Sequence, residues 1–509
     1  MSTVVEPRPD DIVVAERPRP GAPRPYEFPA VASHQLPNGL SILVADLPGR
    51  PLVSASVVIR GGASEEPAEL AGSTVLAARA LSEGTERFDA IQLVEAAERL
   101  GASLHADAGW DALSASVEVP AERLAPAVEL VAEILLRPTF PTAEVERLRD
   151  ERLNDLLQAQ ADPRRRAEQA FVDTIYASAS PYHRPSGGTR ETVERLTASD
   201  LRRAYERNLD PRRATLVVAG DLGGQDVAEL AERLLGSWQG SGPDGSGGSI
   251  VDTAASNRRI VRVVHRPGSV QTEIRIGHRG LPRQIPDFHA VSVMSAILGG
   301  LFNSRLNMKL REEKGYTYGA GAGFDLRRGA GPFAARAAVN TDVTVAATLD
   351  TLTELNRMRD QPVQASELVA ARDFLVGVFP LRFETSGAVV GALSGLVVHG
   401  LPLDELVGYR ARIEAVDGAA VSAAAKEHLH VDSAAIVLVG DVDAFGAELE
   451  AAGLGPILIE RDEIVGPALP PESEAVAPGP VDQEDEEGPT AGAEEPELPG
   501  VPEEPGEVS

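Results

Sequence analysis

Two polar residues late in the chain have types and a spacing that could act on a carbonyl group. Arg311 lies in the stretch that leads from Gly299-Gly300 to Gly315, and Tyr318 follows seven residues after it. A guanidinium and a phenol both present donors to an oxygen that gains negative charge, so the pair could stabilise an oxyanion. The alternative is that Arg311 is one of several charges on a solvated helix face and that Tyr318 is a half-buried strand residue.

The histidines give a weaker signal for chemistry. Most stand alone in the sequence, and a lone histidine is usually structural; examples are His105, His183, His265, His278, His289 and His399. His428 and His430 are two residues apart, a spacing that puts them on different faces of a helix. There is no cysteine, so disulfides, thiolate metal sites and thiol redox chemistry are excluded.

The stretch from Gly62 to Thr85 keeps the frame of an active-site helix. It resembles the inverted zinc motif of the pitrilysin/insulinase family of zinc metallopeptidases, G-x-x-x-E-x5-G-x-A-H-x-x-E-H followed by G-T. The matching positions are Gly62, Glu66, Gly72 and Gly84-Thr85. The resemblance places the first ligand histidine at Val75, the catalytic glutamate at Ala78 and the second ligand histidine at Arg79.

None of these three residues can perform the family's chemistry. Zinc needs imidazole nitrogens or carboxylate oxygens, whereas Val75 has no lone pair and Arg79 is a permanent cation. Ala78 cannot take a proton from a metal-bound water. The resemblance implies a third ligand before Asp162-Pro163, and counting back gives Asp155, or Leu156 if there is a one-residue gap. A single shorter carboxylate does not hold zinc, so we predict no metal in this chain.

Further stretches resemble the same family, in particular its mitochondrial-processing-peptidase-like branch. They are Leu36 to Leu40, Pro181 to Pro185 with Gly188-Thr189, and His399 to Pro402. The resemblance also extends to the family's Arg-Tyr element, for which Arg311 and Tyr318 are the matching positions. It implies that this pair faces the zinc site across a cavity and contacts the substrate backbone and its carbonyl oxygen.

The chain repeats itself once. One constant offset relates Leu201 to Val421 and Gly220-Asp221 to Gly440-Asp441, which indicates a duplicated domain. Each half opens with two predicted strands, namely 40–44 and 53–59 in the first half and 260–265 and 272–278 in the second. We therefore expect an α+β protein with two homologous domains, each a mainly antiparallel sheet with helices packed on one face.

Composition sets the boundaries of these domains. The chain has 509 residues and a formal net charge of −29, which argues against nucleic acid and anionic membrane as partners. Pro/Arg-rich and acidic composition predicts disorder at the two ends, and Gly/Ser-rich composition predicts a linker. The predicted divisions are a disordered N-terminus (1–29), a first peptidase-like domain (30–239), a linker (240–255), a second peptidase-like domain (256–455) and an acidic tail (456–509).

The combination of a degenerate zinc motif and an intact Arg-Tyr pair leads to a functional hypothesis. Some branches of the family divide these parts between two chains, so we expect a non-catalytic subunit of a two-chain zinc-dependent peptidase. The expected partners are a homologous H-x-x-E-H-bearing subunit that supplies zinc, and a peptide substrate. The competing hypotheses are an inactive scaffold and a protein that binds peptides alone. Without an apolar run of about 20 residues or a signal peptide, we expect a cytoplasmic protein.

Overall fold

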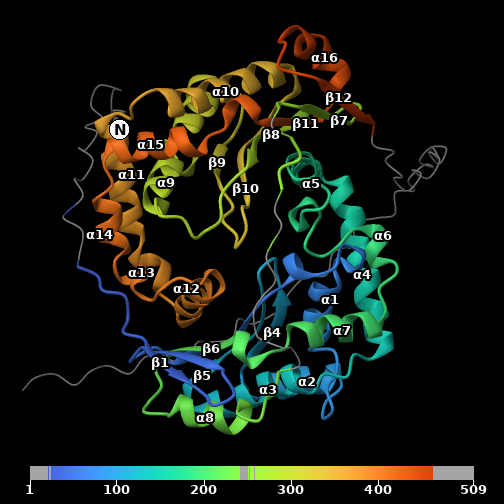
Figure 1. The fold of residues 1–509 in the computed structure, drawn as a ribbon, viewed down its shortest axis with the longest axis vertical. Coiled ribbons are helices and arrows are strands. Elements are labelled where there is room, and N and C mark those ends of the chain that lie inside the picture. The colour runs from blue at the N-terminus through green and yellow to red at the C-terminus, as the bar shows by residue number, and fades with distance from the viewer. Residues whose placement is uncertain (1–20, 22–24, 241–249, 251–252, 257, 462–509) are drawn as a thin grey trace, which may run out of the picture. The chain divides into compact units, whose positions relative to one another are not determined.

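Two six-stranded sheets organise the chain (Figure 1). The computed structural model describes residues 21, 25–240, 250, 253–256 and 258–461. The first sheet has the strand order β1-β2-β6-β3-β5-β4 and the second has the order β12-β7-β11-β8-β10-β9. The strands of the first sheet are β1 (Ala32–Gln35), β2 (Ser41–Asp46), β3 (Leu52–Arg60), β4 (Ser103–Ala108), β5 (Ala112–Pro120) and β6 (Ala214–Gly220). Those of the second are β7 (Val261–His265), β8 (Gln271–Arg279), β9 (Ala320–Phe324), β10 (Pro332–Asn340), β11 (Ala435–Gly440) and β12 (Ile457–Arg461).

Five strands of each sheet share one connectivity, as the internal repeat predicts. In each, the closing strand enters the sheet between the first two predicted strands: β6 pairs parallel with β2 and antiparallel with β3, and β11 does the same with β7 and β8. The pairs β3-β5, β5-β4, β8-β10 and β10-β9 are all antiparallel. The sheets differ in the sixth strand, since β1 pairs antiparallel with β2 whereas β12 pairs parallel with β7. The prediction of an α+β fold with two homologous, mainly antiparallel sheets is confirmed.

Sixteen α-helices pack around these sheets within the described residues. Those of the first half are α1 (Ser73–Ala80), α2 (Ala90–Arg99), α3 (Leu124–Leu136), α4 (Thr142–Ala161), α5 (Pro163–Ile175), α6 (Arg190–Val193), α7 (Ala198–Asn208) and α8 (Val227–Leu235). Those of the second half are α9 (Phe288–Ser295), α10 (Thr344–Asp360), α11 (Ala365–Val378), α12 (Ser386–His399), α13 (Asp404–Val407), α14 (Tyr409–Glu414), α15 (Gly418–His428) and α16 (Val442–Ala451).

The central strands are buried on both faces because the two halves exchange a helix. Helix α12 of the second half packs on β3 and β6, and helix α5 of the first half packs on β8 and β11 (Figure 1). Successive residues of one strand therefore enter different cores: Leu216 packs in the core of the first half, and Val217 packs with α12 in the larger core of the second half. We predicted helices on one face of each sheet. The exchanged helices α12 and α5 cover the other face as well.

Polar contacts also join each exchanged helix to the sheet of the other half. Arg275 of β8 is 2% exposed, and its guanidinium donates to Glu168 of α5 at 2.8 Å and to Glu273 at 2.8 Å. On the other sheet, the Ser386 hydroxyl at the start of α12 donates to the Leu52 carbonyl at 2.7 Å. A buried cation is tolerated only where it is paired, so Arg275 depends on its contact with the other half.

Two short parts of the segments predicted to be unfolded are ordered against the fold. Tyr26 and Phe28 pack their rings against Phe383 of the second half, and Phe28 is 8% exposed. At the other end, β12 pairs parallel with β7 inside the range predicted as acidic tail. The aromatic rings and Ile457, which packs against the core of the second half, supply contact area that average composition does not reveal. Residues 1–20, 22–24 and 462–509 and most of the predicted linker lie outside the described residues.

No single helix among the described residues combines the length and the apolar composition needed to cross a membrane. One pair, Ala365–Phe383 with Ser386–His399, meets the criterion when taken together, and its two members are bent by 114°.

Candidate functional site

The residues that match the frame of the zinc motif build helix α1. Glu66 is 6% exposed, and its carboxylate accepts from the backbone N–H groups of Gly72 at 2.7 Å and Thr74 at 3.0 Å. These groups belong to the start of α1, where backbone donors lack partners inside the helix. Burial raises the pKa of the Glu66 carboxyl, and the bonds from Gly72 and Thr74 oppose that shift. Glu66 therefore caps the helix.

The glycines of the frame are required by close backbone contacts. Gly62 and Gly72 have φ angles of 127° and 95°, in the region that L side chains rarely adopt. A Cβ at Gly62 would lie 2.7 Å from the Gly109 carbonyl oxygen, and one at Gly72 would lie 2.7 Å from that of Gly187. The frame thus serves the packing of α1 whether or not a metal is bound.

The ligand positions on α1 have become apolar or cationic. Val75 and Ala78 are 7% and 0% exposed and belong to the hydrophobic core of the first half. The side chain of Arg79 is 49% exposed, with its Nε 4.0 Å from Asp107 of the edge strand β4. The predicted loss of both histidines and of the glutamate therefore leaves a packed helix with one guanidinium at its surface.

Asp155 lies on α4, which packs on α1, and arginines neutralise it. Its carboxylate accepts from Arg165 at 2.7 Å and also from Arg152. Burial raises the pKa of Asp155, but the two guanidinium groups outweigh burial and hold the pKa below its usual range. Leu156, the alternative position, packs at the margin of the apolar core.

The charge at this site is the reverse of what a zinc ion needs. Burial lowers the pKa of the Arg152 guanidinium; Asp155 opposes this, while the nearby cations of Arg79 and Arg165 add to it. Two arginines thus share the carboxylate of Asp155, and a third, Arg79, lies near Asp107, where the family motif would place two histidines and two glutamates. The residues present do not fit zinc, which requires three lone-pair donors from the protein.

One other group in the described part of the chain has three possible ligand residues, His265, Asp441 and Asp443. His265 is 3% exposed, and its Nδ1 accepts from the Val442 N–H at 3.2 Å. In the first half Asp46 occupies the position equivalent to His265, and its carboxylate accepts from the Leu222 N–H at 3.1 Å. The shared contact assigns His265 a structural role. Because Nδ1 accepts, the neutral ring carries its proton on Nε2, which then cannot bind a metal.

The segment that carries Arg311 and Tyr318 is exposed and irregular. Arg311 lies on a π-helical turn, η8 (Asn307–Glu313), and a second π-helical turn, η7 (Ala296–Gly300), precedes it. Tyr318 is 94% exposed. The Arg311 guanidinium lies 4.5 Å from the centre of the Phe302 ring and 3.5 Å from Glu312. The structure gives no contact between Arg311 or Tyr318 and α1 among the described residues, so their predicted position opposite the zinc motif stays a prediction.

A loop of the second half, between β9 and β10, docks on the first half. The Arg328 backbone N–H donates to Asp111 at 2.8 Å, and its guanidinium donates to Glu65 at 2.8 Å. Arg327 lies over the rings of Trp110 and Tyr182 at 4.9 and 4.7 Å. These residues belong to no motif recognised in the sequence, where a pair of arginines next to Gly329 is the visible signal.

Two duplicated α+β domains, a capped helix at the place of a zinc motif and the loss of its ligands define a peptidase-like protein without its own zinc ligands. The sequence matches the family described as "Insulinase (Peptidase family M16)" over residues 41–185 and the one described as "Peptidase M16 inactive domain" over residues 195–375. The chain belongs to the M16, or pitrilysin/insulinase, family of peptidases and their homologues. The family predicted from the motifs is thereby confirmed.

Relatives of this chain include proteins named as proteases and one named as a non-peptidase. An uncharacterized zinc protease of Mycobacterium leprae is 27% identical over 308 residues, which is 60% of this chain and 68% of that protein. The non-peptidase homolog YmxG of Helicobacter pylori is 24% identical over 361 residues, 70% of this chain and 81% of that protein. A probable mitochondrial-processing peptidase subunit beta of Schizosaccharomyces pombe is 24% identical over 279 residues, 53% of this chain and 59% of that protein.

Solved structures share the fold. A peptidase M16 inactive domain from Pseudomonas fluorescens superposes with a TM-score of 0.74 at 24% identity, covering 81% of this chain and 98% of that one. A protease from Helicobacter pylori gives a TM-score of 0.74 at 18% identity, covering 82% of this chain and 100% of that one. At these identities the likeness shows the architecture alone.

Proposed function

We propose that this chain is the non-catalytic, Arg/Tyr-bearing subunit of a two-chain zinc-dependent peptidase that acts on peptides or small unfolded proteins. The observation that carries the proposal is the contrast between the two candidate sites. Val75 and Ala78 are buried in the core without a metal-binding atom, whereas Arg311 and Tyr318 remain on the surface with their donors available. A homologous partner with an intact H-x-x-E-H motif would supply zinc and the general base.

The local structure around Arg311 supports a contact role. π-helical turns are rare and are frequently found at functional sites, and here two of them flank Leu301–Leu306. Phe302, Met308 and Tyr318 are 67%, 47% and 94% exposed, although large apolar side chains usually find cover in a folded chain. A partner chain or a bound peptide would cover these side chains.

The edge of the first sheet is a suitable place for the peptide. Strand β4 ends the sheet, and its residues alternate between exposed and half-buried over Ser103–Asp107. An extended peptide can add to such an edge through main-chain hydrogen bonds. Arg79 lies beside this strand, so the degenerate zinc site borders the edge where the peptide would be held.

The test is turnover by the reconstituted pair. The chain is mixed with an H-x-x-E-H-bearing homologue, and Arg311→Ala and Tyr318→Phe are compared with the unmodified complex. Because losing one oxyanion donor costs about 10² to 10³ in kcat, we expect kcat/KM to fall by about tenfold or more for a partly solvated pair. The elution volume of the complex should not change.

Matched controls lie in the same segment. Tyr316 is half-buried against the core of the second half, and Lys314 is exposed. Tyr316→Phe and Lys314→Ala should leave turnover unchanged. Unchanged turnover with Arg311→Ala and Tyr318→Phe in an intact complex would refute the proposed role and favour an inactive scaffold.

A further inference from the structure

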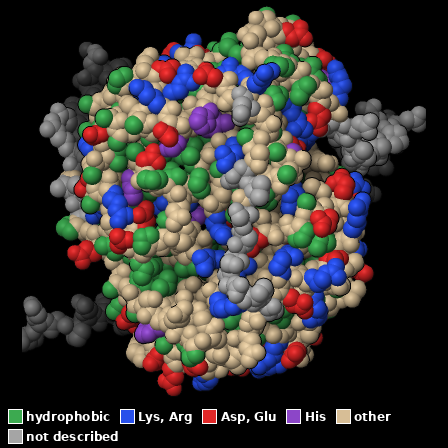
Figure 2. Space-filling view, viewed as in Figure 1, with side chains coloured by type: hydrophobic (Ala, Val, Ile, Leu, Met, Phe, Trp, Pro, Cys, Tyr) green, Lys and Arg blue, Asp and Glu red, His purple; other side chains and the backbone are tan. Residues whose placement is uncertain are grey.

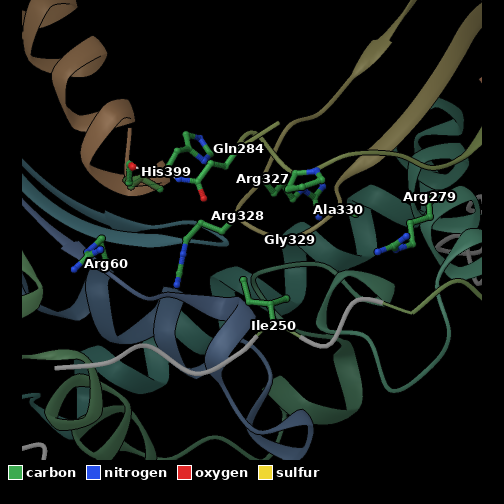
Figure 3. Close-up of a pocket in the computed structure, with 12 residues that line it drawn as sticks. Arg60, Ile250, Arg279, Gln284, Arg327, Arg328, Gly329, Ala330 and His399 are labelled. Carbon is green, nitrogen blue, oxygen red and sulfur yellow. Dashed lines mark hydrogen bonds between the residues drawn. The ribbon is translucent and has the colours of Figure 1, made fainter. Parts of the chain in front are cut away.

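A cavity between the two halves is lined by cationic side chains. Its volume is about 490 Å³, within the range of ligand-binding pockets. The lining contains four arginines and no aspartate or glutamate; the arginines are Arg60, Arg279, Arg327 and Arg328. Figure 3 shows Arg60 and Arg328 on one side of this pocket and Arg279 on the other. We call it the arginine pocket.

The sign of this charge is opposite to that of the whole chain. Acidic residues outnumber basic ones by 77 to 48, so an average surface would present carboxylates. Lys and Arg side chains are nonetheless seen around the middle of the face in Figure 2. A concave surface lined by one sign of charge concentrates ligands of the other sign.

Arg60, the last residue of β3, lies among other arginines and near one carboxylate, that of Glu65. Among the described residues no carboxylate lies within 4.0 Å of its guanidinium, and its side chain is exposed. Burial of part of the side chain lowers the pKa of Arg60, and the cations of Arg328 and Arg213 lower it further. The carboxylate of Glu65, which pairs with both of those arginines, opposes the shift. Like charges held close together disfavour the folded chain unless an anion joins them.

Two further polar atoms of the pocket lack a hydrogen bond in the described part of the chain. They are Nη1 of Arg327 and Nδ1 of His399, both buried. Arg327 uses its other nitrogens on Asp325, at 3.0 and 2.6 Å, while the rings of Trp110 and Tyr182 fix its plane. A buried donor without a partner is unfavourable, so a ligand oxygen at this position would be stabilising.

We infer that the arginine pocket binds the carboxylate groups of an acidic peptide segment. This inference rests on the proposed peptide-binding function and names the substrate class. Guanidinium groups match carboxylates in a planar, two-point geometry, and Arg60 and Arg327 have donors left for it. Arg328, which binds Glu65, holds the loop that presents Arg327 to the pocket.

The test uses the full chain and two labelled peptides of the same length, one with three glutamates and one with glutamines in their place. We expect the acidic peptide to bind about tenfold more tightly at low salt, and the difference to shrink as salt screens the charges. Arg60→Gln should remove most of this difference. Arg190→Gln is the matched control, because Arg190 is a 68% exposed arginine on α6 that pairs with Glu194.

The melting temperature distinguishes a binding role of Arg60 from a structural role. Because Arg60 forms no ion pair within 4.0 Å among the described residues and lies near other cations, Arg60→Gln should leave Tm unchanged or raise it while affinity for the acidic peptide falls. A fall in Tm of more than about 3 °C would show that Arg60 is structural and would overturn the inference. Equal affinity for both peptides, or equal losses in Arg60→Gln and Arg190→Gln, would overturn it as well.

Two further arms identify the ligand. Inorganic phosphate that binds in an Arg60-dependent way, while the acidic peptide does not bind, would overturn the assignment to peptide carboxylates. If neither peptide binds and the reconstituted pair still turns over a neutral peptide, the arginine pocket is not a substrate site and the proposed subunit function stands. If turnover of both peptides depends on Arg311 but not on Arg60, the inference fails in the same way.

Discussion

A buried histidine should make this protein lose stability as the pH falls below neutrality. His278 of β8 is 7% exposed and stacks on Phe333 with ring centres 5.1 Å apart. Its Nδ1 lies 2.8 Å from the Arg279 carbonyl oxygen, and its Nε2 accepts from the His430 N–H at 3.1 Å. Nδ1–H therefore donates and Nε2 is the bare acceptor, which is the neutral ring.

Protonation would break this arrangement. A proton on Nε2 would meet the His430 N–H, and the charge would be buried beside the His430 ring, whose centre is 4.9 Å away. Burial lowers the pKa of His278 from 6.5 to about 4; the bond to the Arg279 carbonyl opposes this, and His430 adds to it. The pKa of His430 is also lowered, first by burial and then by His428.

The sign and size of the effect follow from linkage. Above pH 6.5 His278 is neutral in both the folded and the unfolded chain and costs nothing. As the pH falls from 6.5 to about 4, the unfolded chain takes up the proton and the folded chain does not. The free energy of unfolding should drop by about 1.4 kcal/mol per pH unit, to a total of about 3 kcal/mol, with no further loss below pH 4.

The assay is thermal unfolding of the full chain between pH 7.5 and 4.5 for the unmodified protein and for His278→Gln. A glutamine can accept from the His430 N–H but does not titrate, so its pH dependence should be flatter. The difference should reach about 3 °C in Tm at the acidic end, because a unit of more than about 400 residues shifts by only about 1 °C per kcal/mol. His105 on β4 is exposed, and His105→Gln is the control. Parallel curves for His278→Gln and the unmodified chain would refute the reasoning.

Three further predictions concern the degenerate zinc site. The purified chain alone should contain no stoichiometric zinc by elemental analysis and should cleave no peptide, because too few ligands remain; about one zinc per chain with chelator-sensitive cleavage would contradict this. A repaired variant carries Val75→His, Ala78→Glu, Arg79→His and Asp155→Glu. It should take up zinc, measured by calorimetry, only when Arg152→Gln is added, since the Arg152 cation borders the site; uptake without that change would contradict the charge argument. Glu66→Gln should lower the free energy of unfolding in urea by about 1–2 kcal/mol, because an amide cannot accept from both Gly72 and Thr74; an unchanged urea midpoint would exclude the capping role.

The sequence was sufficient to predict the sheets because their strands carry a local signal. In β5 the buried residues alternate, with Leu113, Ala115, Val117 and Val119 inside, so the period of two was visible without a structure. The repeat then predicted a second copy, and β11 ends at Gly440 as β6 ends at Gly220. Motif spacing likewise predicted the family and the positions on α1.

The exchange of α5 and α12 could not be predicted in the same way. The continuous apolar runs of β6 and β11 indicate burial on both faces, but a sequence does not say which helix covers a strand. That choice depends on contacts between residues far apart, such as Ser386 with Leu52. The arginine pocket has the same origin, since Arg60 and Arg328 are brought together only by the docking of the second half.

The frame of the zinc motif persists here for reasons that do not require zinc. Glu66 satisfies the backbone donors at the start of α1, and Gly62 and Gly72 allow backbone approaches that a Cβ would block at 2.7 Å. Val75 and Ala78 stabilise the helix as core residues, because an apolar side chain on a buried face contributes packing without any metal ligand. Helix packing thus requires the frame residues, whereas zinc binding requires the ligand residues. Either set can therefore be lost while the other is kept. The frame therefore identifies the fold, and only the ligand positions identify a peptidase.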